Sequence, residues 1–172
     1  MVFGISLATY TALHVAVGLI GIGSGLVVLS GFLKGKNFRG WAALFLATTV
    51  ATSATGLGFP VPHLLPSHGV STLSLVTLAV AIAALYKFHL AGSWRRTYVI
   101  CSVAALYFNC FVLVVQSFEK VPALKALAPT QTEPPFVLAQ LVVLALFVFA
   151  GIHAARRFRL VPPKTYSAYS GR

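Results

Sequence analysis

The sequence predicts an all-α integral membrane protein, a bundle of five transmembrane helices with its N-terminus outside and its C-terminus in the cytoplasm. Of the 172 residues, 58% are hydrophobic and only 9% are charged, whereas soluble domains carry about 25% charged residues. The apolar residues fall into five runs, each near or above the roughly 20 residues that a helix needs to cross a bilayer. The basic residues alternate between the connections, which predicts the orientation.

The expected spans cover residues 7–33, 40–59, 68–90, 94–118 and 136–158, all within one domain at 1–160. The first run is the longest, so we expect that helix to tilt or to protrude from the bilayer. It is too long for the core of a signal peptide, and no basic residue precedes it, so we do not expect cleavage. The polar and basic tail, 161–172, is expected to lie along the cytoplasmic surface of the membrane.

The net charge of +11 is explained by topology. All but two of the 13 basic residues fall on one side of the predicted bundle, the exceptions being Lys120 and Lys125. The one-sided set comprises Lys34, Lys36, Arg39, Lys87, Arg95, Arg96, Arg156, Arg157, Arg159, Lys164 and Arg172. The positive-inside rule places that side in the cytoplasm. A nucleic-acid partner is not expected, because no basic patch interleaved with aromatic residues lies outside the spans.

Small residues at helical spacing predict where the first two spans pack. In the first span Gly18, Gly21 and Gly25 follow one another at intervals of three and four, on the same face as His14. Such small-residue stripes let two membrane helices approach closely. In the second span, Ala47 and Ala51 continue an alanine repeat that starts at Ala43, and we expect them to form the matching face. The neighbouring stripe of Thr48, Thr52 and Thr55 should bond its own backbone and take part in packing.

Polar side chains gather in the outer half of the predicted bundle. They are His14, Thr52, Asn109, Gln116 and Gln140, with His68 at the mouth. Two interpretations remain open. The residues form either a hydrogen-bond network that holds the helices in register, or a pocket open to the outside that binds a quinone head-group, a haem edge or a small solute. We favour the network, because inside the cluster His14 is the one titratable residue among amides and hydroxyls, and His68 lies only at the mouth.

The histidines are candidate ligands for a metal or for haem b. The stretch PVPHLLPSHGV, residues 60–70, carries His63 and His68, but these cannot share a helical face across Pro66, and a zinc site needs three or four ligands. We therefore predict no metal site and interpret the stretch as a stiff connector.

Haem b requires two imidazoles at nearly equal depth, and the candidate pairs are His14 with His68 and His89 with His153. The outer pair differs in depth by about 10 Å, whereas the axial nitrogens of one haem are about 4 Å apart.

Two blocks carry a resemblance to known proteins. LLPSHGV, residues 64–70, and VPALKALAPTQTEPPF, residues 121–136, resemble blocks after the second and fourth spans of a group of small, uncharacterised bacterial inner-membrane proteins. The resemblance runs from about His14 to Arg159. It implies a multi-pass helical bundle in the bacterial inner (cytoplasmic) membrane, and it implies no activity.

Three functions therefore stay open, and none uses a recognisable catalytic residue. We favour a non-catalytic subunit or partner-binding component of a membrane complex, in contact with the lipid bilayer and with other membrane subunits or further copies of itself. The first alternative is a membrane electron-transfer protein that binds haem b or quinone. The second is a small-solute transporter or channel, disfavoured by the lack of internal repeats and of buried carboxylates.

Overall fold

The computed structural model describes residues 4–59 and 66–158, and within these ranges it consists of helices and short connections, without a strand. The elements are α1 (Leu7–Leu33), α2 (Arg39–Leu57), α3 (Pro66–Ile82), the π-helical turn η1 (Ala83–Lys87), α4 (Trp94–Lys120), α5 (Pro122–Leu127) and α6 (Pro134–Arg157). Five helices are long and apolar enough to cross a membrane, the third being α3 continued through η1. The all-helical prediction is confirmed, and the five apolar helices fit a multi-pass membrane protein.

The observed helices follow the expected spans closely. Each end lies within about three residues of its predicted position, an ordinary margin for helix boundaries. The short helix α5, within the block at 121–136, is an element that the hydropathy pattern does not predict. The expected tail at 161–172 and most of the connector, 60–65, lie outside the described residues.

Local sequence fixes both ends of α1. The Ser6 hydroxyl oxygen accepts a hydrogen bond from the Thr9 N–H at 3.1 Å, as expected of an N-cap serine. At the other end the Lys36 N–H donates to the Gly31 carbonyl at 2.8 Å, and the Gly35 N–H donates to the Phe32 carbonyl at 3.0 Å. This is a Schellman motif, in which Gly35 takes the left-handed conformation at φ +68°. The motif turns the chain directly toward α2.

The turn after η1 is unusual because two consecutive residues with side chains are left-handed. His89 has φ 48° and Leu90 has φ 59°. The Phe88 N–H donates to the Ala83 carbonyl and the Leu90 N–H to the Ala84 carbonyl, both at 3.0 Å. The left-handed conformation is costly for residues that carry a Cβ. Burial of the Leu90 side chain in the core offsets that cost.

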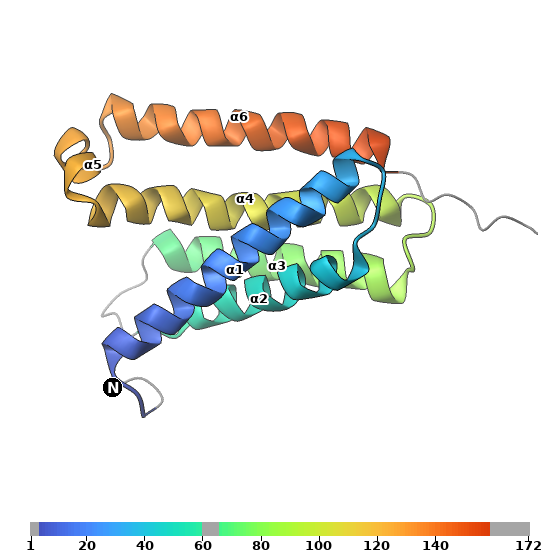
Figure 1. Cartoon of the computed structure of the whole chain (residues 1–172), viewed down its shortest axis with the longest axis horizontal. Coiled ribbons are helices and arrows are strands. Elements are labelled where there is room, and N and C mark those ends of the chain that lie inside the picture. Colours follow the sequence, from blue (N-terminus) through green and yellow to red (C-terminus); the bar gives the residue numbers. More distant parts are fainter. Residues whose placement is uncertain (1–3, 60–65, 159–172) are drawn as a thin grey trace, which may run out of the picture.

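The helices form two antiparallel hairpins joined by α3 (Figure 1). The first hairpin is α1 with α2, and the second is α4 with α6, closed by α5. Helix α3 packs between α2 and α4. Helix α1 crosses α4 obliquely, so that it meets α6 where α1 ends and lies away from α6 where α1 begins (Figure 1).

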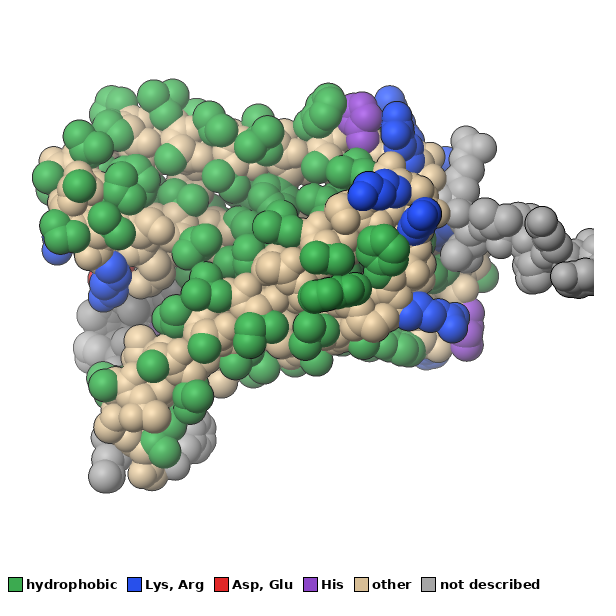
Figure 2. Space-filling model, in the orientation of Figure 1, with side chains coloured by type: hydrophobic (Ala, Val, Ile, Leu, Met, Phe, Trp, Pro, Cys, Tyr) green, Lys and Arg blue, Asp and Glu red, His purple; other side chains and the backbone are tan. Residues whose placement is uncertain are grey.

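The two ends of the bundle differ in charge, as Figure 2 shows. We call the end that holds the start of α1, the end of α4 and all of α5 the α5 end. The opposite end is the basic end, and its described cations are Lys34, Lys36, Arg39, Lys87, Arg95, Arg96, Arg156 and Arg157. Both acidic residues of the chain, Glu119 and Glu133, belong to the α5 end.

A cluster of aromatic rings closes the bundle at the basic end. Phe32 of α1 meets Tyr98 of α4 and Phe158, the residue after α6, edge to face, with ring centroids 5.5 Å and 5.0 Å apart. All three side chains are almost completely buried. These rings therefore connect the first, the fourth and the last spans.

The connection between α5 and α6 is ordered by the Glu133 carboxylate. It accepts hydrogen bonds from the Thr130 N–H and hydroxyl and from the Thr132 N–H, at 3.1, 2.9 and 3.1 Å. Desolvation acts to raise the pKa of the Glu133 carboxyl, but these hydrogen bonds outweigh it, so the pKa lies below its usual value. The Gln131 amide also donates to the Val115 carbonyl of α4 at 3.1 Å. The loop is thus ordered by its own hydrogen bonds and fastened to α4.

Candidate functional site

The best-defined polar feature is a seam of side chains where α1 packs against α2 and α4. We call it the polar seam, and its members are Tyr10, His14, Gly18, Gly21, Thr49, Thr52, Thr55 and Asn109. Its residues on α1 recur at intervals of three and four, so they share one face of that helix. The seam runs from the α5 end to about the middle of the bundle.

At the α5 end of the seam, His14 is joined to α2. Its Nδ1 lies 2.8 Å from the Thr55 hydroxyl oxygen, and the Tyr10 hydroxyl donates to the Thr55 carbonyl at 2.8 Å. The Phe59 ring meets both aromatic rings edge to face, at 5.0 Å from Tyr10 and 5.2 Å from His14. Two hydrogen bonds and two ring contacts therefore fix the start of α1 against the end of α2.

The Thr55 hydroxyl determines which nitrogen of His14 carries a proton. That hydroxyl has one proton, and it donates to the Ala51 carbonyl at 2.7 Å. With that donor assigned, its oxygen is left to accept from His14, and this arrangement favours the neutral tautomer with its proton on Nδ1. The Nε2 atom of His14 then holds a lone pair and can act as an acceptor or as a ligand.

In the middle of the seam, three helices meet at Gly21. A Cβ atom there would lie 3.2 Å from the Thr49 hydroxyl of α2 and 3.4 Å from the Asn109 amide nitrogen of α4. The Asn109 amide donates to the Thr49 hydroxyl oxygen at 3.3 Å, and Thr49 is fully buried. This bond gives a buried polar side chain the partner that it needs away from water. It also links α2 to α4 beside Gly21 of α1.

The hydroxyls of α2 bond mostly within their own helix. Thr48, Thr52 and Thr55 each donate to the carbonyl four residues earlier, at 2.7 to 2.9 Å. This confirms the expectation for the threonine stripe. Ser53 is an exception, because it donates across to Ser74 of α3 at 2.9 Å in a buried contact.

The structure distributes the residues of the predicted outer pocket among separate contacts. Thr52 lies against Gly18, and His14 and Asn109 bond Thr55 and Thr49 as described above. Gln140 of α6 donates to the Phe111 carbonyl of α4 at 3.3 Å. Its Oε1 atom is buried without a partner among the described residues. The remaining two residues are Gln116, which is exposed on α4, and His68, which is half-buried near the start of α3.

The predicted packing residues also divide into two groups. Gly18, Gly21 and Gly25 all face α2, and the tightest of these contacts is at Gly25, where a Cβ would come within 2.6 Å of Leu106 and 2.9 Å of Phe45. Ala47 and Ala51 instead lie on the exposed side of α2. The surface that α2 offers to α1 consists of Phe45 and the threonines, not of the alanine repeat.

The other candidate haem ligands lie at the basic end and bond the backbone. The Nδ1 atom of His89 is 3.2 Å from the Lys87 carbonyl oxygen. The Nδ1 atom of His153 is 3.0 Å from the Phe149 carbonyl oxygen, and its ring packs on Phe149 with centroids 4.0 Å apart. Among the described residues no three His, Cys, Asp or Glu side chains are grouped as a metal would require. His63 lies outside those residues.

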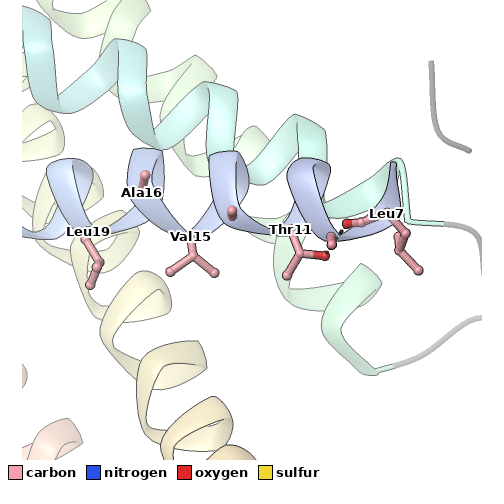
Figure 3. A pocket seen from close by; sticks show the side chains of 7 residues that line it. Leu7, Thr11, Val15, Ala16 and Leu19 are labelled. Carbon is pink, nitrogen blue, oxygen red and sulfur yellow. Dashed lines mark hydrogen bonds between the residues drawn. The ribbon is translucent and has the colours of Figure 1, made fainter. Parts of the chain in front are cut away.

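Beside the seam, α1 presents an exposed apolar face with a shallow hollow. Figure 3 shows side chains projecting from this face, and together they line a shallow, wide-open hollow. The lining residues are Leu7, Ala8, Thr11, Ala12, Val15, Ala16 and Leu19. All of them belong to α1, and Leu7, Val15 and Leu19 are each about half exposed. The hollow therefore has one wall, made of alanines between larger side chains.

Sequence reasoning missed this hollow and several partners within the seam. Ala8, Ala12 and Ala16 repeat every four residues, which predicts a second small-residue face on this helix. The packed face was assigned from the glycines alone. Thr49 and Ser53 lie in a segment, TTVATSAT, where hydroxyls cover almost half of the helix circumference. Their spacing alone does not tell which hydroxyls face another helix.

Comparison of the chain with protein-family models, with curated proteins and with solved structures finds no match.

Proposed function

We propose that this protein is a non-catalytic subunit of a membrane complex in the bacterial cytoplasmic membrane, and that α1 is the helix with which it binds its partner. The observation that carries the proposal is the hollow on α1. Its small side chains, Ala8, Ala12 and Ala16, let another helix approach the backbone, and its larger ones can pack around that helix. We assign the missing second wall to a transmembrane helix of a partner subunit.

The contacts inside the bundle support a binding role over solute handling. The intramembrane polar side chains with described contacts bond other helices or their own backbone, as at Asn109, Ser53 and Gln140. A solute pathway would need such groups turned toward an open cavity. The hollow that the chain does offer is almost wholly apolar, with Thr11 as its one polar side chain, and that hydroxyl donates to the Leu7 carbonyl.

The test is native purification of the tagged full chain and of two variants in which an alanine is replaced by leucine. Ala12→Leu fills the hollow, whereas Ala47→Leu adds the same side chain on an exposed part of α2. We expect the wild type and Ala47→Leu to co-purify with a membrane protein in mild detergent, and Ala12→Leu to lose it. The particle mass from size exclusion with light scattering reports the assembly. A wild type that is only monomeric would contradict the proposal. A complex made only of copies of this chain would show that α1 binds a second copy and not a different subunit.

The tautomer of His14 favours one second function, the binding of haem b. A ligand histidine commonly donates its second ring nitrogen to a protein acceptor, which fixes the ring. His14 does so through Nδ1 toward Thr55, and its Nε2 lone pair is of the kind that binds iron. The visible absorption spectrum of the purified protein separates this function from the first.

A further inference from the structure

The basic end contains a place where two segments far apart in the sequence bring cations together. The Schellman turn after α1 holds Lys34 and Lys36 on either side of Gly35, with both side chains exposed. A Cβ at Gly35 would lie only 3.3 Å from the Arg157 carbonyl oxygen, so this turn presses against the last residue of α6. Arg156 and Arg157 are exposed there as well.

Within residues 4–59 and 66–158 these cations have no acidic partner. The whole sequence has two acidic residues, Glu119 and Glu133, and both belong to the α5 end. Among the described residues the one salt bridge joins Lys120 to Glu119 at 3.3 Å. The charge of the basic end must therefore be balanced by anions from outside the protein.

Apolar surface begins directly beside the cations. On α6, Phe149 is 64% exposed and Ile152 is 46% exposed, within two turns of Arg156. On α1, Leu26 is 49% exposed, two turns before Lys34. A ligand that matches both surfaces carries a negative charge at one end and hydrocarbon at the other. Free phosphate or an acidic peptide would leave the apolar part unmatched.

From this arrangement we infer that the basic end binds an anionic phospholipid, with its phosphate between the α1–α2 turn and the end of α6. Lys34, Lys36, Arg156 and Arg157 would contact the head-group, and the acyl chains would lie along the exposed faces of α1 and α6. Basic clusters beside transmembrane helices commonly bind such lipids. The inference stands independently of the partner proposed for α1, because it concerns the other end of α1.

The experiment is a titration of the full-length protein in neutral detergent with phosphatidylglycerol or phosphatidylcholine, followed by native mass spectrometry. The test variant is the double exchange Lys36→Gln with Arg157→Gln. The matched control, Lys120→Gln with Lys125→Gln, removes the same charge at the α5 end. A third variant, Lys36→Arg with Arg157→Lys, keeps the charge and should bind as the wild type does. Circular dichroism and melting temperature in the same detergent confirm that each variant is folded.

We expect phosphatidylglycerol to bind the wild type more tightly than phosphatidylcholine does. Each cation removed should weaken the Kd about fivefold, so about 25-fold for the test variant, with no such loss for the control. Equal binding by the folded test variant and the wild type would overturn the inference, as would equal affinity for the two lipids. Displacement of the lipid by millimolar inorganic phosphate would show a free-anion site instead. Tighter binding of a poly-glutamate peptide would assign the surface to an acidic protein segment.

Discussion

At the scale of single residues, the role of His14, as a haem ligand or as a structural hydrogen-bond donor, distinguishes the two leading functions. Its Nδ1–H bond to Thr55 is compatible with a structural role and with haem ligation. We expect the purified protein to be colourless. His14→Ala should then remove one interhelical hydrogen bond and destabilise the protein by about 0.6 kcal/mol, with about 1.7 kcal/mol as the upper end of measured values.

The measurement is a visible spectrum of the purified protein, oxidised and reduced, together with unfolding of both proteins in mixed micelles. A Soret band that disappears in His14→Ala would place haem binding first among the functions. The Thr55→Val variant is the matched control, because it removes the hydrogen bond but keeps the imidazole. A structural histidine predicts similar losses of stability for the two variants.

At the scale of single elements, the glycines of α1 differ in how closely other helices approach them. Gly25 and Gly23 are two residues apart on the same helix, yet a Cβ at Gly25 would clash with Leu106 and Phe45, whereas one at Gly23 meets nothing within 4 Å. We expect Gly25→Ala to cost about 1–3 kcal/mol, as overpacking does in a tight core. Gly23→Ala should be neutral or stabilising by up to about 1 kcal/mol, because alanine favours helix.

Unfolding of the two glycine variants in mixed micelles, monitored by circular dichroism, gives both free energies. Equal effects of the two substitutions would contradict the described contact between α1, α2 and α4. Gly18→Ala provides an intermediate case, since its nearest neighbour would be the Thr52 methyl at 3.4 Å.

At the same scale, the sequence predicts where the long helices lie better than it predicts which face of each helix is packed. Hydropathy and length located the long helices, because a span must be apolar on nearly every side. This uniformity also removes the polar-outside signal that reveals the buried face of a soluble helix. Gly18, Gly21 and Gly25 still marked the packed face of α1, because their spacing of three and four follows one side of the helix. On α2, alanine is equally suited to lipid and to a neighbouring helix, and Ala47 and Ala51 were therefore assigned to a packed face although they are exposed.

At the scale of the whole molecule, the charge difference between the two ends predicts the topology. The eight described cations of the basic end should face the cytoplasm, with both chain termini on opposite sides of the membrane. A cytoplasm-active reporter fused after Arg172 should be active, and one fused before Met1 should be inactive. The reverse pattern would contradict the orientation. Activity of both fusions would contradict five crossings.

The ring cluster predicts that the basic end is the more stable part of the bundle. Phe158→Ala should destabilise the protein by about 3 kcal/mol, near the lower end for such changes in packed cores. Phe149→Ala, in α6, is the control, because that ring is mostly exposed. Hydrogen exchange in detergent should become faster in the last turns of α1 and α6 in Phe158→Ala. Unchanged exchange there would contradict the role assigned to the cluster.

The contact between Phe32 and Phe158 also has a consequence for the biosynthesis of this protein. Phe158 is synthesised more than a hundred residues after Phe32, a delay on the order of ten seconds at typical translation rates. Tyr98 is made about halfway through that interval, and until Phe158 follows, the Phe32 and Tyr98 rings lack the neighbour that covers them. A chain that stops before α6 would leave this surface open to membrane quality control. Closure of the bundle is therefore coupled to completion of the last span.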